Sequence, residues 1–191
     1  MLEPEQIEGR LTFLHQAERL KDTLRSAYTA TGQQENAAAH SWRLSLLALV
    51  FADQYPEIDL LRLLKLCIIH DLGEALSGDI PAPLQTDDEN KAVAERRDFT
   101  TLLQSLEPVV QSELLALWDE YDQAVSPEAI LAKGLDKLET ILQHNQGANP
   151  ADFDYIFNLD YGRQYTDRHP FLVQLRAILD RNTRANAKNQ A

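Results

Sequence analysis

The sequence predicts an all-α protein, and three features of the chain support this. Glycine and proline are sparse, with 7 and 8 copies in 191 residues, so long stretches run without a helix breaker. Apolar residues recur at steps of three and four over much of the chain, which is the spacing of amphipathic helices. No segment combines strict apolar–polar alternation with β-branched side chains, as a strand would. We therefore expect one compact helical bundle.

The first half of the chain is expected to form three helices, covering about 4–28, 36–54 and 59–76. The polar stretch 29–34 contains Gly32 and separates the first two helices. Asn36 is placed to cap the second helix, and Pro56 separates it from the third. The second helix is apolar on most of its sides, so we expect it to be central. The segment 77–83, with Gly78, Pro81 and Pro83, is expected to be a loop.

The second half is expected to form helices over about 87–106, 108–123, 126–144, 151–158 and 170–184. Ser126 is a suitable N-cap, with Pro127 at the first helical position. The tail 185–191 is expected to be frayed. We predict a single domain over residues 1–191, with its core in about 10–145 and the last helices in 151–184.

The charge of the chain limits its partners. Its net charge is -12, which makes it a poor nonspecific ligand for nucleic acid or for an anionic membrane. The same negative field repels anionic substrates, so any phosphate chemistry requires a local cation. Cys67 is the single cysteine, so no intrachain disulfide can form. With no signal-like N-terminus and no apolar run near the roughly 18 residues of a membrane span, we expect a cytoplasmic protein.

The adjacent pair His70-Asp71 ends an almost unbroken apolar run. Burying these two side chains without partners would cost several kcal/mol. Glu74 follows His70 by four residues and Asp71 by three, so on a helix it shares a face with both. Two interpretations stay open for the pair: a packed histidine oriented by its neighbour, or a group of metal ligands and acid–base residues.

Two further polar residues interrupt apolar helices. His40 follows three alanines, and Asp136 lies beside a stripe of leucines. Alone, His40 reads as a surface histidine and Asp136 as a boundary carboxylate. Together with His70 and Asp71 they make a reasonable divalent site, because nitrogen and oxygen ligands of this mix suit Mn²⁺, Co²⁺, Zn²⁺, Fe²⁺ or Ni²⁺ better than Ca²⁺. Mg²⁺ stays open. Such a metal would acidify a water molecule and neutralise a phosphoryl oxygen.

These residues, in order, resemble the H…HD…D signature of the HD-domain metal-dependent phosphohydrolases. The stretch HDLGEALSGDIPAP, residues 70–83, is similar to the corresponding stretch of the bacterial 5'-deoxynucleotidases and their eukaryotic HD-domain-containing relatives. The stretches ENAAAHS, 35–41, and KGLDKLETIL, 133–142, resemble two further parts of these proteins. The resemblance covers roughly residues 10–145 and implies the helical HD-domain fold and a homodimer.

The resemblance also implies a role for individual side chains. As metal ligands it implies His40, His70, Asp71 and Asp136. As catalytic residues it implies Glu74, which positions or deprotonates the attacking water, and Asp79, which assists at the leaving oxygen or contacts the sugar. For phosphate binding it implies Arg25, and Lys137 could also approach the phosphate, although a solvated lysine is the simpler interpretation.

The chain departs from this family at two positions. Ser26 stands where the deoxynucleotidases place a tryptophan that screens the sugar, with Tyr28 nearby, so selectivity for deoxyribose is an open question. Ala39 stands where the family often has an acidic residue. The other histidines, His15, His144 and His169, are expected to be structural or exposed, and Trp42 and Trp118 are expected to pack. Cys67 shows no sign of activation.

The predicted activity is hydrolysis of a phosphomonoester, with a nucleoside 5'-monophosphate the favoured substrate and a divalent metal as cofactor. Two alternatives are kept. One is a non-catalytic metal-binding or scaffold HD domain. The other is an HD hydrolase of a different nucleotide, a triphosphate or a guanosine alarmone.

Overall fold

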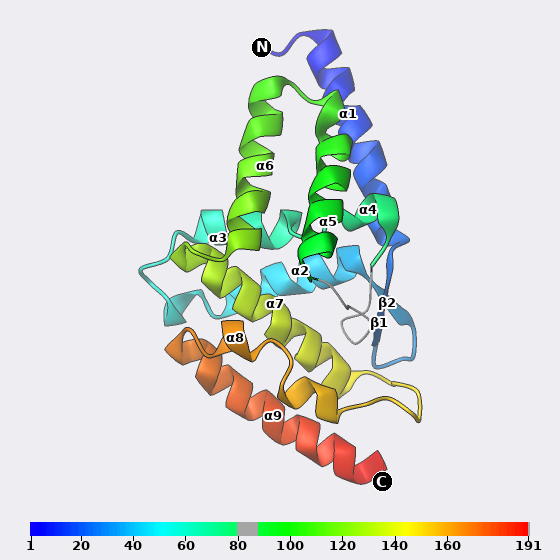
Figure 1. Cartoon of the computed structure of the whole chain (residues 1–191), viewed down its shortest axis with the longest axis vertical. Coiled ribbons are helices and arrows are strands. Elements are labelled where there is room, and N and C mark those ends of the chain that lie inside the picture. The colour runs from blue at the N-terminus through cyan, green and yellow to red at the C-terminus, as the bar shows by residue number, and fades with distance from the viewer. Residues whose placement is uncertain (80–87, 191) are drawn as a thin grey trace.

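The structure, a computed structural model, describes residues 1–79 and 88–190, and within them it is helical apart from one short hairpin (Figure 1). The α-helices are α1 (Pro4–Ala17), α2 (Ala37–Val50), α3 (Leu60–Ile69), α4 (Glu74–Ser77), α5 (Asp88–Leu102), α6 (Pro108–Gln123), α7 (Pro127–Gln146), α8 (Arg163–Thr166) and α9 (Pro170–Gln190). Short 3₁₀ helices cover Glu18–Lys21, Ala52–Gln54, Leu103–Ser105 and Ile156–Leu159. The all-α prediction is confirmed. The part of the expected loop that holds Pro81 and Pro83 lies outside the described residues.

Side-chain caps fix the starts of three helices. The Asn36 side chain accepts a hydrogen bond from the amide of Ala39, at 2.9 Å, as the sequence predicted. The hydroxyl of Ser126 caps α7 in the same way, and Pro127 follows it at the first helical position. Asp59 caps α3 by accepting from the amide of Arg62. Each cap satisfies a backbone donor that the first helical turn leaves unpaired.

A hairpin replaces the end of the expected first helix, so that prediction is wrong between Leu24 and Tyr28. Strand β1 (Leu24–Tyr28) pairs antiparallel with β2 (Gln34–Asn36). In the connecting turn Gly32 has φ of +83°, a backbone conformation that favours glycine. Strand β1 also lies against α7, where the Gln143 side chain donates a hydrogen bond to the carbonyl of Tyr28. This tertiary contact outweighs the local helical pattern.

The third expected helix breaks at its polar end. Helix α3 stops at Ile69, residues 70–73 form turns, and the short α4 follows. The backbone of α5 approaches this turn closely, because a Cβ on Gly73 would lie 2.6 Å from the carbonyl oxygen of Glu95. The break gives the side chains of the turn directions that one continuous helix would not provide.

The C-terminal part of the chain is more ordered than expected. Helix α9 continues to Gln190, where a frayed tail from 185 was predicted, and Asn186 anchors it by donating to the carbonyl of Asn145, at 2.8 Å. The short helix expected over 151–158 begins later, as the 3₁₀ helix Ile156–Leu159. Helix α8 was not predicted.

Helix α7 is the centre of the molecule (Figure 1). It packs against α2, α3, α6, α8 and α9. Fully buried apolar side chains line most of its length: Leu131, Leu135, Leu138 and Ile141. The expectation that the helix now called α2 is central is wrong, because one side of α2 faces outward. Trp42 on that side is 66% exposed, against the prediction that it packs, whereas Trp118 is buried as predicted.

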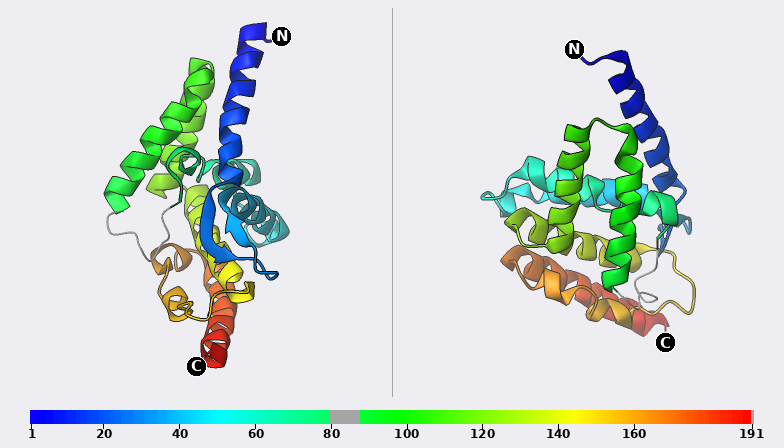
Figure 2. Two further views of the ribbon diagram at one scale, coloured as in Figure 1. Left: turned by 90° about the vertical axis from the view of Figure 1, so that its right-hand side faces the viewer. Right: turned by 45° about the horizontal axis from the view of Figure 1, so that its top comes forward.

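Helices α5 and α6 run side by side as a pair, green in Figure 2. A second apolar cluster lies where this pair meets the end of α3, and its members are Ile69, Phe99, Leu102, Leu103, Leu106 and Trp118. Trp118 links α6 to the turn after α3, because its indole N–H donates a hydrogen bond to the carbonyl of His70, at 3.2 Å. The polar end of α3 therefore lies between two packed regions. No described helix has the length and apolar composition of a membrane span.

Replacing Leu66 by alanine tests this packing, with Leu14 on α1 as a matched control. Leu66 is fully buried and Leu14 is 60% exposed. We expect Leu66→Ala to lower the free energy of unfolding by about 2–5 kcal/mol, because it leaves a cavity. Leu14→Ala should change it by less than about 0.5 kcal/mol. Urea denaturation measures both, and equal losses would contradict the described core.

Candidate metal centre

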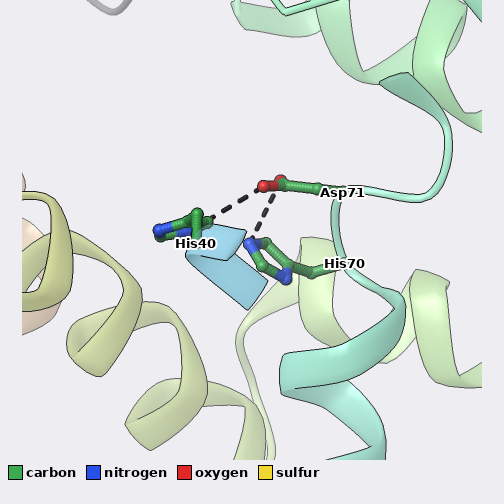
Figure 3. A group of neighbouring side chains, drawn as sticks. All are labelled: His40, His70 and Asp71. Atoms are coloured by element: carbon green, nitrogen blue, oxygen red, sulfur yellow. Dashed lines mark ion pairs between the residues drawn. The ribbon is translucent and has the colours of Figure 1, made fainter. Parts of the chain in front are cut away.

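Helix α2, the turn that follows α3, and helix α7 bring two imidazole rings and two carboxylates together. Figure 3 shows the Asp71 carboxylate beside the rings of His40 and His70. Its Oδ1 lies 3.1 Å from Nε2 of His70, and its Oδ2 lies 3.8 Å from Nε2 of His40. Asp136 approaches from α7, with its Oδ1 at 3.1 Å from Nε2 of His40 and 3.9 Å from Nε2 of His70. The four residues expected as ligands are therefore neighbours.

Hydrogen bonds on the far side of each ring orient the two histidines. Nδ1 of His70 donates to the carbonyl of Cys67 at 2.9 Å, and its buried Nε2 has no hydrogen-bond partner among the described residues. Nδ1 of His40 donates to the Glu139 carboxylate. Both Nε2 atoms therefore face the carboxylates, which is the arrangement of metal-ligating histidines whose other nitrogen is held by an acceptor. The interpretation of His40 as a surface histidine is wrong, because the ring is fully buried.

The charges around His40 favour its protonated form when no metal is present. Burial and Arg25 act against the proton, but Glu139 and Asp136 outweigh them and raise the pKa of His40 to about 9. Burial also opposes ionisation of Asp136, yet Lys137 and His40 hold the pKa of this carboxyl well below its usual range. A metal ion at this position would replace the proton on Nε2, since metal and proton compete for the same lone pair.

Glu139 and Arg43 support the cluster from behind, and the sequence did not suggest either. Glu139 is fully buried and lies between His40 and the guanidinium of Arg43. Glu35 is a further potential ligand beside them, since a carboxylate oxygen of Glu35, a ring nitrogen of His40 and a carboxylate oxygen of Glu139 lie within 4.8 Å of one another. Glu139 follows Asp136 by three residues on a helix, and this spacing was the one signal that could have revealed it.

Arg25 approaches the centre from strand β1. Its Nη1 lies 3.3 Å from the Asp71 carboxylate, its Nη2 donates to the hydroxyl of Thr140 at 3.2 Å, and its Nε lies 3.4 Å from Glu35. Burial opposes the charge, but the carboxylates, Asp71 foremost, outweigh it and raise the pKa of Arg25. Arg25 is therefore mostly buried, and it lies on a strand where the sequence predicted a helix.

Glu74 carries a strongly perturbed carboxyl group. It is only 3% exposed, and its Oε2 has no hydrogen-bond partner among the described residues. Burial first, then the negative charges of Asp71 and Asp79, raise the pKa of Glu74 to about 10. The ammonium group of Lys91, on α5, lies 3.8 Å from Oε1 and partly offsets this. Lys91 was missed, because a lysine on a polar helix carries no distinguishing pattern.

The last two expected residues also reach this region. Burial raises the pKa of Asp79, and this residue lines the same cavity as Glu74. Nζ of Lys137 lies 2.9 Å from Oδ2 of Asp136 and over the ring of Tyr161, so Lys137 is not simply solvated. The hydroxyl of Tyr121 donates to the same Oδ2 at 2.7 Å. Asp136 is thus held by partners on its outer oxygen.

These residues surround a cavity of about 60 Å³. The described side chains that line it are Arg25, Ser26, Ala27, Asp71, Glu74, Asp79, Lys91, Asp136, Lys137, Thr140, His144 and Tyr161. A larger cleft of about 720 Å³ adjoins it, and five residues line both spaces: Asp71, Lys91, Asp136, Lys137 and Tyr161. The smaller space has the size for an ion and a few small groups, and the cleft has the size for an organic molecule.

This helical fold and its histidine–aspartate cluster define the class of metal-dependent phosphohydrolases. The HD domain family model matches residues 17–176, and the chain belongs to this family. The 5'-deoxynucleotidase HDDC2 of Bos taurus is 30% identical over 187 residues, which span 95% of this chain and 89% of that protein. The protein of the same name from Danio rerio is 34% identical over 145 residues, spanning 73% and 70%.

Solved structures show the same fold. The crystal structure of a protein described as a predicted metal-dependent phosphohydrolase, from Magnetospirillum magnetotacticum, superposes with a TM-score of 0.76 at 25% identity, covering 96% of this chain and 97% of that one. The PH0347 protein from Pyrococcus horikoshii superposes with a TM-score of 0.61 at 28% identity, covering 91% and 98%. The similarity therefore extends over almost the whole chain.

The raised pKa of Glu74 predicts a pH-dependent cost to stability. In the folded state this carboxyl binds its proton more tightly than an ordinary glutamate carboxyl, whose pKa is 4.5. Its contribution to stability is therefore complete below pH 4.5 and is lost as the pH rises towards 10. In the presence of a chelator, Glu74→Gln should be more stable than the wild type at pH 8, and the difference should shrink at pH 5.

Denaturant unfolding at the two pH values measures this difference. Glu113→Gln, at an exposed position of α6, is the control and should match the wild type at both. A Glu74→Gln protein that is no more stable than the wild type at pH 8 would contradict the burial of an ionising carboxyl at this position.

Proposed function

We propose that the chain hydrolyses the phosphomonoester of a nucleoside 5'-monophosphate with a divalent metal held by His40, His70, Asp71 and Asp136. The observation that carries the proposal is the convergence of two Nε2 atoms and two carboxylates beside the buried guanidinium of Arg25. The names of the similar proteins, which are 5'-deoxynucleotidases, support the substrate class.

The residues present fit a divalent metal. Nε2 of His70 is buried, faces Asp71 and has no hydrogen-bond partner in the described part of the chain, which is costly unless something binds it. Two imidazole nitrogens and two carboxylates suit Mn²⁺, Co²⁺, Mg²⁺, Zn²⁺, Fe²⁺ or Ni²⁺, and the choice among these metals is left to experiment. When bound, the metal would supply positive charge against the phosphoryl oxygens and acidify a water molecule.

The chain's own residues would do the rest of the work. Arg25 binds the phosphoryl oxygens, exchanging its present contact with Asp71 for a charge-assisted hydrogen bond to phosphate. When the charge of a bound metal offsets that of Asp71 and lowers the raised pKa of Glu74, the ionised carboxylate would orient the attacking water and accept its proton through the oxygen that lacks a partner. Asp79, whose pKa is raised by burial, protonates the leaving 5'-oxygen. Lys137 holds the outer oxygen of Asp136 and adds positive charge near the phosphate.

Two observations bear on the alternatives. A purely metal-binding domain has no use for Glu74, whose burial among negative charges is unfavourable and is typical of a functional site.

A triphosphate or an alarmone carries more negative charge than a monophosphate. The described cavity offers Arg25, Lys91 and Lys137 as cations, and the segment 80–87, IPAPLQTD, contains no lysine or arginine. A monophosphate therefore matches the available charge better.

The proposal includes a cytoplasmic homodimer that uses neither nucleic acid nor membrane. The net charge of -12 supports the expectation that the protein binds neither nucleic acid nor an anionic membrane. Outward-facing apolar side chains on the neighbouring helices α2 and α3 support self-association: Trp42, Leu46, Leu49, Val50, Leu61 and Ile68. A group of exposed apolar side chains on adjacent helices is typical of a protein–protein interface.

A nucleotide panel tests the function directly. After chelation, phosphate release from nucleoside 5'-monophosphates should return with at least one of Mn²⁺, Co²⁺, Mg²⁺ and Zn²⁺. His70→Ala and Asp71→Ala should lose both the bound metal and the activity. Glu74→Ala should keep the metal and lose turnover by about 100-fold or more, because it removes a proton acceptor. If no phosphomonoester is hydrolysed with any metal, the enzyme proposal is wrong.

Glu139→Gln tests how His40 is oriented. The amide keeps an acceptor for Nδ1 of His40 but removes the charge that stabilises the ring and Arg43. We expect the affinity for Mn²⁺ to fall by about 10–100-fold, as is usual when a partner behind a metal ligand is changed. Competition with a chelating dye measures this affinity. The exposed control Glu113→Gln should leave it unchanged, and an equally unchanged Glu139→Gln would show that Glu139 has no such role.

Charge substitution on α2 tests the dimer. The double variant Trp42→Glu, Leu49→Glu should sediment as a monomer at concentrations where the wild type is a dimer, since it buries two carboxylates in the interface. Val109→Glu, at a 69% exposed position of α6, should leave the dimer intact. A wild type that is monomeric at high concentration would rule the dimer out.

A further inference from the structure

His144 occupies an unusual place on the central helix. The sequence suggested a structural or exposed histidine, and the ring is indeed buried, with an exposed fraction of 6%. It also lines the small cavity, together with Arg25, Ser26 and Thr140. The residue is therefore part of the wall of the proposed substrate site and not only of the core.

The contacts of the ring define its two nitrogens. Nδ1 donates to Oδ1 of Asn158 at 2.8 Å, and Nε2 is buried with no hydrogen-bond partner among the described residues. Phe153 packs edge-on against the ring, with centroids 4.9 Å apart, which restricts its rotation. Burial lowers the pKa of His144, so the imidazole is neutral at physiological pH. Nε2 is therefore a fixed hydrogen-bond acceptor.

The position of this acceptor relative to the phosphate-binding groups follows from helix geometry. Asp136, Thr140 and His144 are spaced by four residues, so they lie on one face of α7 with a rise of about 6 Å between neighbours. Thr140 contacts the guanidinium of Arg25 at 3.2 Å. His144 thus lies about one helical turn beyond Thr140 and its contact with Arg25, on the side away from Asp136.

The chemistry of Nε2 restricts what can bind there. A phosphate oxygen is an acceptor, and the lone pair of a neutral imidazole repels it. A hydroxyl or an amine can donate to the lone pair. In a nucleoside 5'-monophosphate, the donors nearest to the phosphate are the hydroxyls of the sugar. Ser26 and Ala27, which line the same cavity as His144, have small side chains that leave room for a sugar ring.

We propose that His144 is a specificity-determining residue whose Nε2 accepts a hydrogen bond from a sugar hydroxyl of the nucleotide. The inference rests on the proposed function and adds to it the orientation of the substrate: the sugar lies along α7, with its hydroxyl edge towards the C-terminal end of the helix. A buried acceptor left without its donor is costly, so substrates that lack the hydroxyl are disfavoured.

The test compares three monophosphates that share one base: the ribonucleotide, the 2'-deoxynucleotide and the 2',3'-dideoxynucleotide. In the wild type, kcat/KM for the dideoxynucleotide should be lower by about tenfold or more than for the best substrate of the three. In His144→Phe, which keeps a planar ring without the acceptor, this difference should disappear. His144→Gln, with an amide oxygen near the position of Nε2, should restore part of it. Phenyl phosphate, which has no sugar, should be hydrolysed equally by all three proteins.

Each of the other outcomes overturns the inference. A His144→Phe protein that still discriminates against the dideoxynucleotide shows that another residue reads the sugar. Loss of phenyl phosphate hydrolysis in both variants shows a structural role alone. A wild type that cleaves nucleotides without discrimination removes the inference and leaves the proposed function standing, whereas a wild type that cleaves neither nucleotides nor phenyl phosphate removes both. If His144→Phe fails to fold, His144→Gln decides. A smaller kcat/KM preference for the ribonucleotide over the dideoxynucleotide than in the wild type supports the inference, and an unchanged preference overturns it.

Discussion

Burying carboxylates inside a helical bundle is the constraint on which the rest of the structure depends. Asp71, Asp136 and Glu139 lose their hydration at the centre of the molecule, and each would be costly without a positive partner. The partners come from distant segments: Arg25 from the hairpin and Arg43 from α2. The hairpin, the early end of α3 and the central position of α7 all serve to bring these charges into contact. A divalent metal would complete the same compensation, because its charge would face the oxygens that the guanidinium groups leave open.

The helices could be predicted from sequence wherever local chemistry determines them. The Asn36 cap and the Ser126-Pro127 start are each set within four residues of chain, and both appear in the structure. Strand β1 could not be predicted in this way, because its stability comes from α7, more than a hundred residues later in the chain, through contacts such as Gln143 to Tyr28. Helix α9 extends beyond its apolar pattern for a similar reason, since Asn186 bonds to Asn145.

The candidate site follows the same division. The pair His70-Asp71 drew attention because two polar residues end an apolar run, and the ordered resemblance added His40 and Asp136. Among the residues that the sequence did not indicate, Glu139 and Lys91 have ordinary neighbours in the chain, and only their contacts with His40 and Glu74 reveal their place in the site. Arg25 was expected at the phosphate, but its strand was expected to be helix, so the right residue was assigned to the wrong local structure.

The central claim is that the two Nε2 atoms and the two aspartates form a metal centre. Anomalous diffraction from crystals grown with Mn²⁺ tests it most directly. The account predicts one strong peak within coordination distance of Nε2 of His40 and of His70 and of carboxylate oxygens of Asp71 and Asp136. The cluster of Glu35, His40 and Glu139 should hold no metal, because Arg25 and Arg43 already neutralise it. A peak at that second cluster, or none at His70, would contradict the account.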